Sequence, residues 1–186
     1  MRESDEILYT RFLEKKDNED LKALLARHRE GLTLFLYGFV HDMEDAEDLM
    51  LYAFAEAASG TARFSGKSSF KTWLFSIGRN QAMKHLRKRR FLFLSADDAA
   101  KAADPADTPE TVVLEDERNR HLYQALNELN TEYRQVLFLI YFEEMNIEEA
   151  AAVMKKNTKQ IYNLTHRGRE ALRKQLESMG FEYERY

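Results

Sequence analysis

The amino-acid sequence predicts an all-α protein with two small helical domains joined by an acidic, flexible linker. Composition gives the first observation, because two Pro and seven Gly among 186 residues argue against a turn-rich β fold. Spacing gives the second, because apolar residues recur at helical intervals along most of the chain. The third is an abrupt change of composition, which places the first domain at residues 1–94, the linker at 95–110 and the second domain at 111–186.

Four helices are expected in the first domain. Apolar spacing indicates helices over residues 4–15 and 18–40, and an acidic start indicates a third helix that ends at Gly60. Gly31 and Gly38 weaken the second helix locally and would allow close helix packing. His28 lies on its apolar stripe and is expected in the core. A loop over residues 61–69 leads to a fourth helix, from about residue 68 to residue 90.

The loop and the fourth helix form the most basic stretch of the chain. Residues 63–90 contain nine Lys or Arg and no Asp or Glu, in a protein of net charge −4. Basic side chains contact phosphates and aromatic rings stack on unpaired bases, so the stretch indicates binding to single-stranded or melting DNA. The candidate DNA-binding residues are Arg63, Phe64, Lys67, Trp73, Arg79, Asn80, Lys84, Arg87 and Lys88.

Two alternatives remain open for this stretch. The helix could be a core helix with a solvated basic end. Phe64 could be a lid on the core or a wedge for a base.

The linker and the second domain follow. Eight acids, one Lys, Pro105 and Pro109 lie between residues 95 and 117, and such a segment should bury little and be flexible. Helices are then expected over residues 111–129, 133–144, 147–154 and 158–176. Asn146 and Glu149 have the spacing of a capping box at the start of the third of these.

The last two helices have the pattern of a helix-turn-helix. Residues 155–174 carry seven Lys or Arg against one acid, Glu170. The first turns of such a helix present hydrogen-bonding groups to base edges. An ordinary helical hairpin is the alternative. The candidate duplex-reading residues are Thr158, Lys159, Gln160, Asn163, His166, Arg167 and Arg173.

Acids cluster at the start of the third helix, in the stretch DMEDAED that begins at Asp42. Carboxylates in a first turn interact favourably with the helix dipole, so one interpretation is a solvated helix start. The other interpretation is a docking face for a basic partner.

Other classes of function find little support. The chain has no Cys, which excludes disulfides and thiolate metal sites. Its five His are scattered, and no HExxH or glycine-rich phosphate loop occurs, so no enzyme activity, metal or cofactor is expected. No apolar run approaches the roughly 20 residues that span a bilayer, and the N-terminus is too acidic for a signal peptide. We therefore expect a cytoplasmic protein without membrane insertion.

Taken in order, these segments resemble the sigma factors of bacterial RNA polymerase, in particular the small extracytoplasmic-function (ECF) group of the sigma-70 family. Residues 46–54, AEDLMLYAF, are similar to the family's polymerase-docking helix. Residues 69–90, SFKTWLFSIGRNQAMKHLRKRR, are similar to its promoter-melting and −10-reading helix, and residues 63–68 to its base-capturing loop. Residues 126–174 resemble its −35-reading domain.

The resemblance implies a non-enzymatic initiation factor that brings core RNA polymerase to promoter DNA through −10 and −35 elements and assists strand opening. It also implies an anti-sigma factor as a further partner. The resemblance assigns polymerase docking to Asp45, Glu47, Asp48, Leu49, Leu51 and Tyr52.

The chain departs from the family pattern in two places. A Gln-Glu pair is usual where this chain has Leu51 and Tyr52, so the polar contact expected from that Gln is absent. An Asp is usual where this chain has Lys84, which makes the reading helix more basic.

One interpretation from another class remains, a helix-turn-helix repressor or activator whose N-terminal helical domain senses a signal or dimerises. Trp73 beside the basic loop favours the initiation factor. A regulator that binds only duplex DNA needs no stacking platform there.

Overall fold

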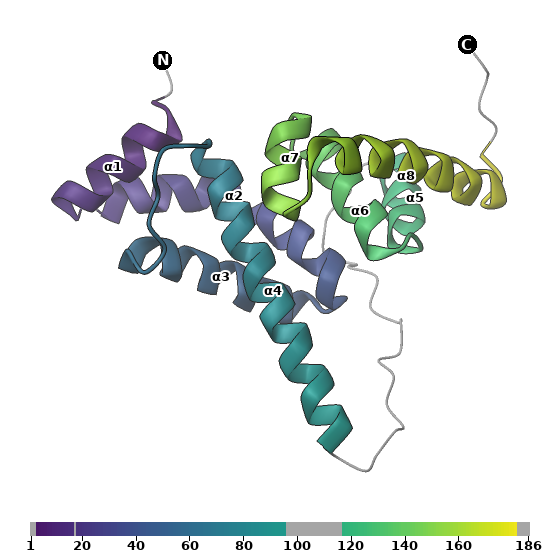
Figure 1. Ribbon diagram of the computed structural model, residues 1–186, viewed down its shortest axis with the longest axis horizontal. Coiled ribbons are helices and arrows are strands. Elements are labelled where there is room, and N and C mark those ends of the chain that lie inside the picture. The colour runs from purple at the N-terminus through teal and green to yellow at the C-terminus, as the bar shows by residue number, and fades with distance from the viewer. Residues whose placement is uncertain (1–2, 17, 96–116, 182–186) are drawn as a thin grey trace.

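The computed structural model describes residues 3–16, 18–95 and 117–181, and the regular structure of these residues is entirely helical (Figure 1). The first domain consists of α1 (Asp5–Lys15), α2 (Asn18–Val40), α3 (Met43–Ser59) and α4 (Phe70–Ser95). The second consists of α5 (Glu117–Asn127), α6 (Thr131–Leu137), the π-helical turn η1 (Phe138–Phe142), α7 (Ile147–Met154) and α8 (Thr158–Ser178). The predicted all-α fold is confirmed.

None of the helices in these ranges is both long enough and apolar enough to cross a membrane. The predicted linker lies outside the described residues, apart from Ser95 at the end of α4.

Side-chain caps fix where several helices begin. Ser4, Asp42 and Asn130 each accept a hydrogen bond from the backbone N–H three residues further on. The capping box predicted for α7 is present, because the Asn146 and Glu149 side chains each accept the backbone N–H of the other residue. The predicted ranges 4–15 and 18–40 agree with α1 and α2 to within one residue.

The helix predicted over residues 111–129 is described from Glu117 and ends at Asn127, and residues 111–116 lie outside the described part of the chain. Two other predicted helices differ from the structure. Helix α4 continues past Arg90 to Ser95, so the apolar stretch after Arg90 extends the basic helix. The helix expected over residues 133–144 is divided, because η1 forms a wider turn in which Phe138 stacks on Phe142 with ring centroids 5.2 Å apart. One residue inserted into a helical turn barely changes the apolar spacing, so periodicity alone did not reveal it.

The core of the first domain lies between α2, α3 and α4. At Gly78 of α4, an added Cβ would lie only 2.9 Å from Cδ1 of Leu32 in α2, so the two helices approach at the limit of packing. Fully buried side chains around this contact belong to Leu24, Leu32, Leu36, Phe70, Leu74 and Phe75.

Helix α1 fixes the start of α4. The Glu6 carboxylate accepts a hydrogen bond of 2.8 Å from the backbone N–H of Phe70, a helix-start group that lacks a partner within its own helix. Asp5 of α1 pairs with Arg27 and His28 of α2, at 2.6 Å in each case. His28 is 8% exposed, so the prediction of a core histidine is confirmed.

Helices α7 and α8 form the predicted helix-turn-helix. Lys155 ends α7 in the left-handed conformation, with φ of 54°, and Asn157 caps α8. The inner side of α8 packs through the fully buried Ile161 and through Gly168, where an added Cβ would lie 3.3 Å from Cγ of Leu137 in α6. This packing determines which face of α8 points outward.

The two domains pack against each other, with α4 beside α7 and α2 beside α6 and η1 (Figure 1). The rings of Phe35 in α2 and Phe138 in η1 have centroids 6.1 Å apart. Arg134 of α6 is 7% exposed and donates a hydrogen bond of 2.7 Å to the Gly38 carbonyl of α2. The second domain therefore shares buried contacts with the first.

We expect Glu6→Ala to lower the free energy of unfolding by about 1 kcal/mol, because the first turn of α4 loses its acceptor. Glu14→Ala is the matched control, since Glu14 lies exposed on the same helix. Urea unfolding followed by circular dichroism measures both. Equal stabilities of the two variants would show that this bond does not fix α4.

Candidate nucleic-acid interface

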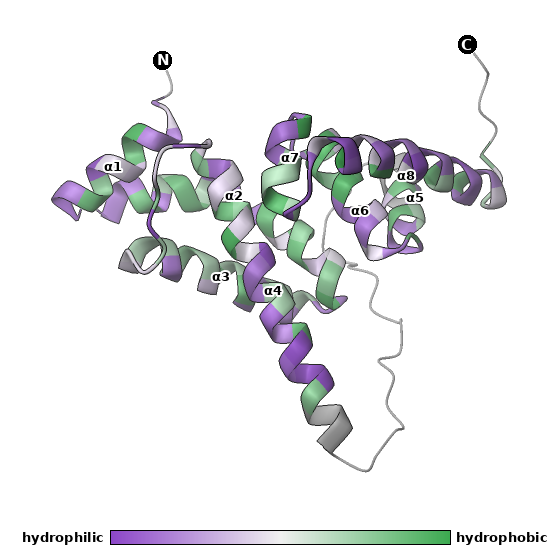
Figure 2. Ribbon diagram, viewed as in Figure 1, coloured by the Kyte–Doolittle hydropathy of each residue, from purple (hydrophilic) through white to green (hydrophobic). Residues whose placement is uncertain are grey.

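The second half of α4 extends as an arm away from the body of the molecule (Figure 1). Ala82 is the last buried residue of α4 among those whose side chains are described. The arm is mostly hydrophilic (Figure 2) and exposes Lys84, Arg87, Lys88 and Arg90. Since α4 contains no Asp or Glu, this arm attracts a polyanion.

The loop before the arm exposes Arg63 and Lys67 but turns Phe64 inward. The Phe64 ring meets Tyr9 edge-on with centroids 5.7 Å apart and lies 5.1 Å from the Trp73 ring. Both Phe64 and Trp73 are partly buried against the core. Phe64 is therefore a lid in this structure, and only the exposed parts of the two rings are open to a base.

Arg79 and Asn80 do not lie on the exposed arm. Both are half-buried, and Nε of Arg79 is buried without a hydrogen-bond partner. Burial lowers the pKa of Arg79, and the carboxylate of Glu132 in the second domain acts in the opposite direction. The sequence grouped Arg79 with Lys84, whereas the structure places it beside the second domain.

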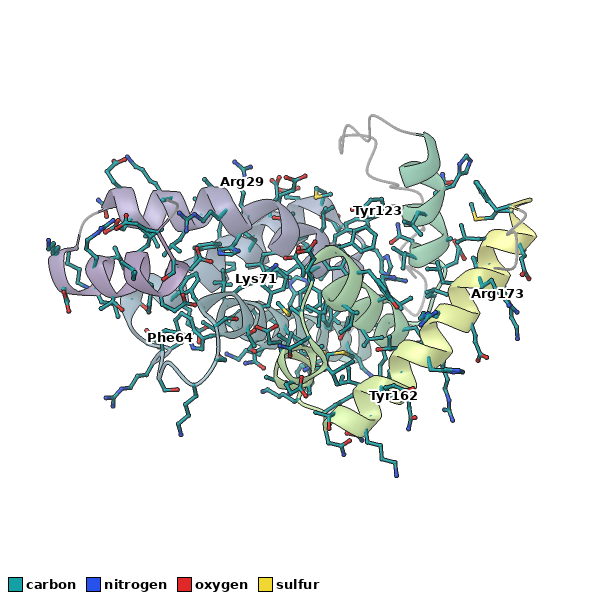
Figure 3. All side chains as sticks on the ribbon, turned by 90° about the horizontal axis from the view of Figure 1, so that it is seen from above. Arg29, Phe64, Lys71, Tyr123, Tyr162 and Arg173 are labelled. Carbon is teal, nitrogen blue, oxygen red and sulfur yellow. The ribbon has the colours of Figure 1, made fainter. Side chains whose placement is uncertain are left out.

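Helix α8 carries the second polar face. Figure 3 shows Tyr162 and Arg173 on α8 at the edge of the molecule. The seven predicted duplex-reading residues are all exposed: Thr158, Lys159, Gln160, Asn163, His166, Arg167 and Arg173.

Gln160 has a structural role that the sequence reasoning missed. Its carboxamide oxygen accepts the Asn157 N–H at 2.9 Å, and the Asn157 side chain accepts the Gln160 N–H at 2.8 Å. This second capping box holds the start of α8. In the first two turns of α8, Lys159 and Asn163 are left better placed to reach bases.

Tyr162 is a further candidate that the sequence reasoning omitted. It is 67% exposed and lies between Lys159 and His166 on the outward face of α8. Its spacing of three and four residues from these two could have identified it. An exposed ring on a reading helix can make apolar contact with a thymine methyl group.

The later turns of α8 carry exposed contacts between basic and acidic side chains. Nδ1 of His166 lies 3.8 Å from Glu170, and Nε of Arg173 lies 3.4 Å from Glu177. Exposed pairs of this kind contribute little to stability, so a phosphate can replace the carboxylate partner at low cost.

Helix α3 presents a mixed apolar and acidic face. Leu51 is 53% exposed and Tyr52 is 63% exposed, and Glu47 and Asp48 are exposed beside them. Leu49 is only 5% exposed and packs in the core, so it supports this face without being part of it.

Asp45 connects α3 to the basic arm. Its Oδ2 atom lies 3.4 Å from Nε2 of His85 and 3.9 Å from a guanidinium nitrogen of Arg89, both in α4. Asp45 therefore links the acidic face of α3 to the arm. Among the described side chains, no cluster of three His, Asp or Glu is placed to hold a metal ion.

Two family models match the chain. The sigma-70 region 2 model matches residues 24–91, which include α3, the basic loop and the exposed part of the arm. The sigma-70 region 4 model matches residues 120–172, which include the helix-turn-helix.

The chain is also similar to individual RNA polymerase sigma factors along most of its length. The ECF RNA polymerase sigma factor SigX of Bacillus subtilis is 29% identical over 164 residues, which cover 86% of this chain and 84% of SigX. The RNA polymerase sigma factor CarQ of Myxococcus xanthus is 30% identical over 164 residues, which cover 87% of this chain and 92% of CarQ.

A solved structure shares the fold. The sigma factor RpoE of Bartonella quintana, in complex with the anti-sigma factor NepR, has a TM-score of 0.67 at 24% identity. The match covers 86% of this chain and 98% of that one.

Proposed function

Because this chain belongs to the sigma-70 family of RNA polymerase sigma factors, in its ECF group, we propose that its two domains divide promoter recognition between them. It is a transcription initiation factor whose partners are core RNA polymerase and promoter DNA. The alternative of an unrelated helix-turn-helix regulator is set aside by this membership. One observation carries the proposal, namely that two outward basic faces, on α4 and α8, belong to different domains.

In this proposal the second domain, residues 111–186, reads duplex DNA at the −35 element. Lys159 and Asn163 sit in the first turns of α8, from where a recognition helix reaches base edges. Arg173 lies three turns further on, where a helix leaves the groove, and suits a phosphate. Affinity and sequence discrimination are thus assigned to different parts of one helix.

The first domain, residues 1–94, binds the −10 element and assists strand opening. The arm supplies charge for the backbone of the separated strand through Lys84, Arg87 and Lys88. Phe64 and Trp73 offer ring surface to an unpaired base once the loop shifts. Strand opening is an equilibrium that binding energy displaces, so this chain needs no catalytic group.

Helix α3 is the proposed contact with core polymerase. Exposed Leu51 and Tyr52 give apolar area, and Glu47 and Asp48 favour a basic partner surface. Asp45 links α3 to the arm through its contact with His85. Binding of α3 to the enzyme would thereby also position the −10 reader.

An anti-sigma factor is a further proposed partner. The structural relative RpoE is in complex with such a protein, and we extend this to the present chain by analogy of fold. Because the protein would act together with RNA polymerase, the proposed site of action is the cytoplasm.

Substitutions in α8 should separate base reading from backbone contact. Lys159→Ala or Asn163→Ala should cost roughly 1–3 kcal/mol at a few −35 positions, if a bidentate base contact is lost. Arg173→Ala should weaken binding to all promoters alike. Fluorescence anisotropy of holoenzyme on a set of −35 variants measures both effects. The same sequence dependence for all three variants would contradict the division of roles.

Charge reversal on α3 should weaken polymerase binding. We expect Asp48→Lys to reduce affinity for core enzyme about tenfold, a loss of roughly 1.4 kcal/mol. Glu14→Lys, an exposed charge reversal on α1, is the control. A pull-down with purified core polymerase compares them, and undiminished binding of the Asp48 variant would reject α3 as the docking helix.

Loss of both rings should impair strand opening more than initial binding. Stacking contributes roughly 1–3 kcal/mol per base, so a Phe64→Ala, Trp73→Ala double variant should lower permanganate reactivity of promoter thymines about tenfold. Because both rings pack against Tyr9, a thermal melt must first show that the variant is folded. Wild-type reactivity from a folded double variant would leave α4 as a duplex clamp only.

A further inference from the structure

One face of α1 supports the loop that the proposed function assigns to base capture. The matched sigma-70 region 2 begins at residue 24, whereas α1 ends at Lys15. Glu6 and Tyr9 are three residues apart and therefore lie on one side of α1. Tyr9 is 1% exposed and is one of the largest fully buried side chains among the described residues. The proposed function has not yet given this face of α1 a role.

Three contacts of α1 follow the basic loop between α3 and α4 from its beginning to its end. Before the loop, the Tyr9 hydroxyl donates a buried hydrogen bond of 2.9 Å to the carbonyl of Ala57, in the last turn of α3. Within the loop, the Phe64 ring meets the Tyr9 ring edge-on. After the loop, the Glu6 carboxylate accepts the N–H of Phe70. Helix α1 therefore supports both ends of the loop and its middle.

The Tyr9 ring is also a shared neighbour of the aromatic residues at the start of α4. Its centroid lies 5.0 Å from that of Phe70 and 5.2 Å from that of Trp73. The Trp73 ring in turn lies 5.7 Å from Phe70 and 5.1 Å from Phe64. Phe70 and Tyr9 are fully buried, whereas Trp73 is only half-buried. The two buried rings thus form a backing behind the ring that is offered to DNA.

A backing of this kind orients an exposed ring before a ligand arrives. A Trp side chain has only two χ angles, and close packing against part of the indole restricts both. Tyr9 is held in turn by its burial and by the hydrogen bond to Ala57. Burial also raises the pKa of Tyr9, so its hydroxyl remains a donor at neutral pH. Trp73 is therefore ordered during folding rather than during base capture, which strengthens stacking.

We propose that Tyr9 is a positioning residue for base capture, which orients the Trp73 ring and, through Phe64, the basic loop. Tyr9 is buried beneath these two rings, so it acts through them and does not touch DNA. The functional half of this proposal rests on the proposed function, which supplies base capture. The placement half rests on the ring contacts and the Ala57 bond alone.

The fluorescence of Trp73 tests the placement, because it is the single Trp of the chain. In the full-length protein, Tyr9→Leu should shift Trp73 emission to the red and increase its quenching by acrylamide, since the indole loses its backing. Tyr9→Phe keeps the ring and should leave both close to wild type. Phe12→Leu is the matched control, because Phe12 is also buried on α1 and, among the described rings, contacts Tyr9 alone. Wild-type emission and quenching in folded Tyr9→Leu would overturn the placement.

Loss of a buried ring can also prevent folding, so a thermal melt followed by circular dichroism precedes each measurement. Tyr9→Met is the second variant, because unbranched Met adapts to irregular gaps in a core. Phe12→Met is its control. If neither Tyr9 variant folds, Tyr9 is required for the fold itself, and a specific role in positioning is rejected.

Permanganate reactivity of promoter thymines in holoenzyme tests the functional half. Tyr9→Leu should lower this reactivity about fivefold, the contribution of one aromatic pair, while initial promoter binding by fluorescence anisotropy stays within about twofold of wild type. Phe12→Leu should change neither, and Tyr9→Phe should retain reactivity because the ring remains. Equal losses of reactivity in Tyr9→Leu and Phe12→Leu would show that Tyr9 acts through stability only and would overturn the proposal.

Failure of this proposal can be distinguished from failure of the proposed function. If the Phe64→Ala, Trp73→Ala double variant lowers reactivity but folded Tyr9→Leu does not, base capture stands and its support by Tyr9 is wrong. If neither lowers reactivity, base capture by these rings is itself rejected, while Trp73 emission still decides the placement.

Discussion

One half of helix α4 is buried in the core and the other half is exposed to solvent. The other helices are arranged around that constraint. Along its first half, Phe70, Leu74 and Phe75 are fully buried, and Gly78 allows α2 to approach. After Ala82 none of the described side chains of the helix is fully buried, and beyond Met83 and Leu86, which still pack against the core, its surface is mainly the basic surface of the arm. Glu6 of α1 caps its start, and Asp45 of α3 pairs with its arm. A disturbance of the buried half would therefore reach the DNA surface and the α3 face together.

The sequence was sufficient for the elements that depend on local signals. Helical spacing placed α1 and α2, and the Asn146 capping box was visible from two residues three positions apart. Charge clustering identified the arm and the outer face of α8. The roles of the aromatic residues were harder to predict. The sequence around Phe64 and Trp73 is the same whether their rings pack on the core or stack on a base. Only their ring contacts with Tyr9 distinguish the two.

Contacts between distant parts of the chain could not be predicted in the same way. Periodicity shows that a helix has an inner face but does not name the helix that covers it. Arg79 was expected among the DNA-binding residues, yet it is half-buried, and the charge of Glu132 in the second domain acts on it. Gly31 and Gly38 did signal close packing on α2, although the sequence could not say that Glu143 and Arg134 would fill the space. Gln160 was assigned to bases although it follows Asn157 by three residues, the same capping-box spacing that identified Asn146 and Glu149.

The central claim is that α4 and α8 read different promoter elements in one complex, and tethered cleavage tests it most directly. Because the chain has no Cys, an iron chelate can be attached at Arg90→Cys on the arm or at Glu170→Cys on α8, both exposed positions. In holoenzyme bound to a promoter, the Arg90→Cys conjugate should cut DNA at the −10 element and the Glu170→Cys conjugate at the −35 element. Cleavage of the same element by both conjugates would contradict the division of promoter contacts between the two domains.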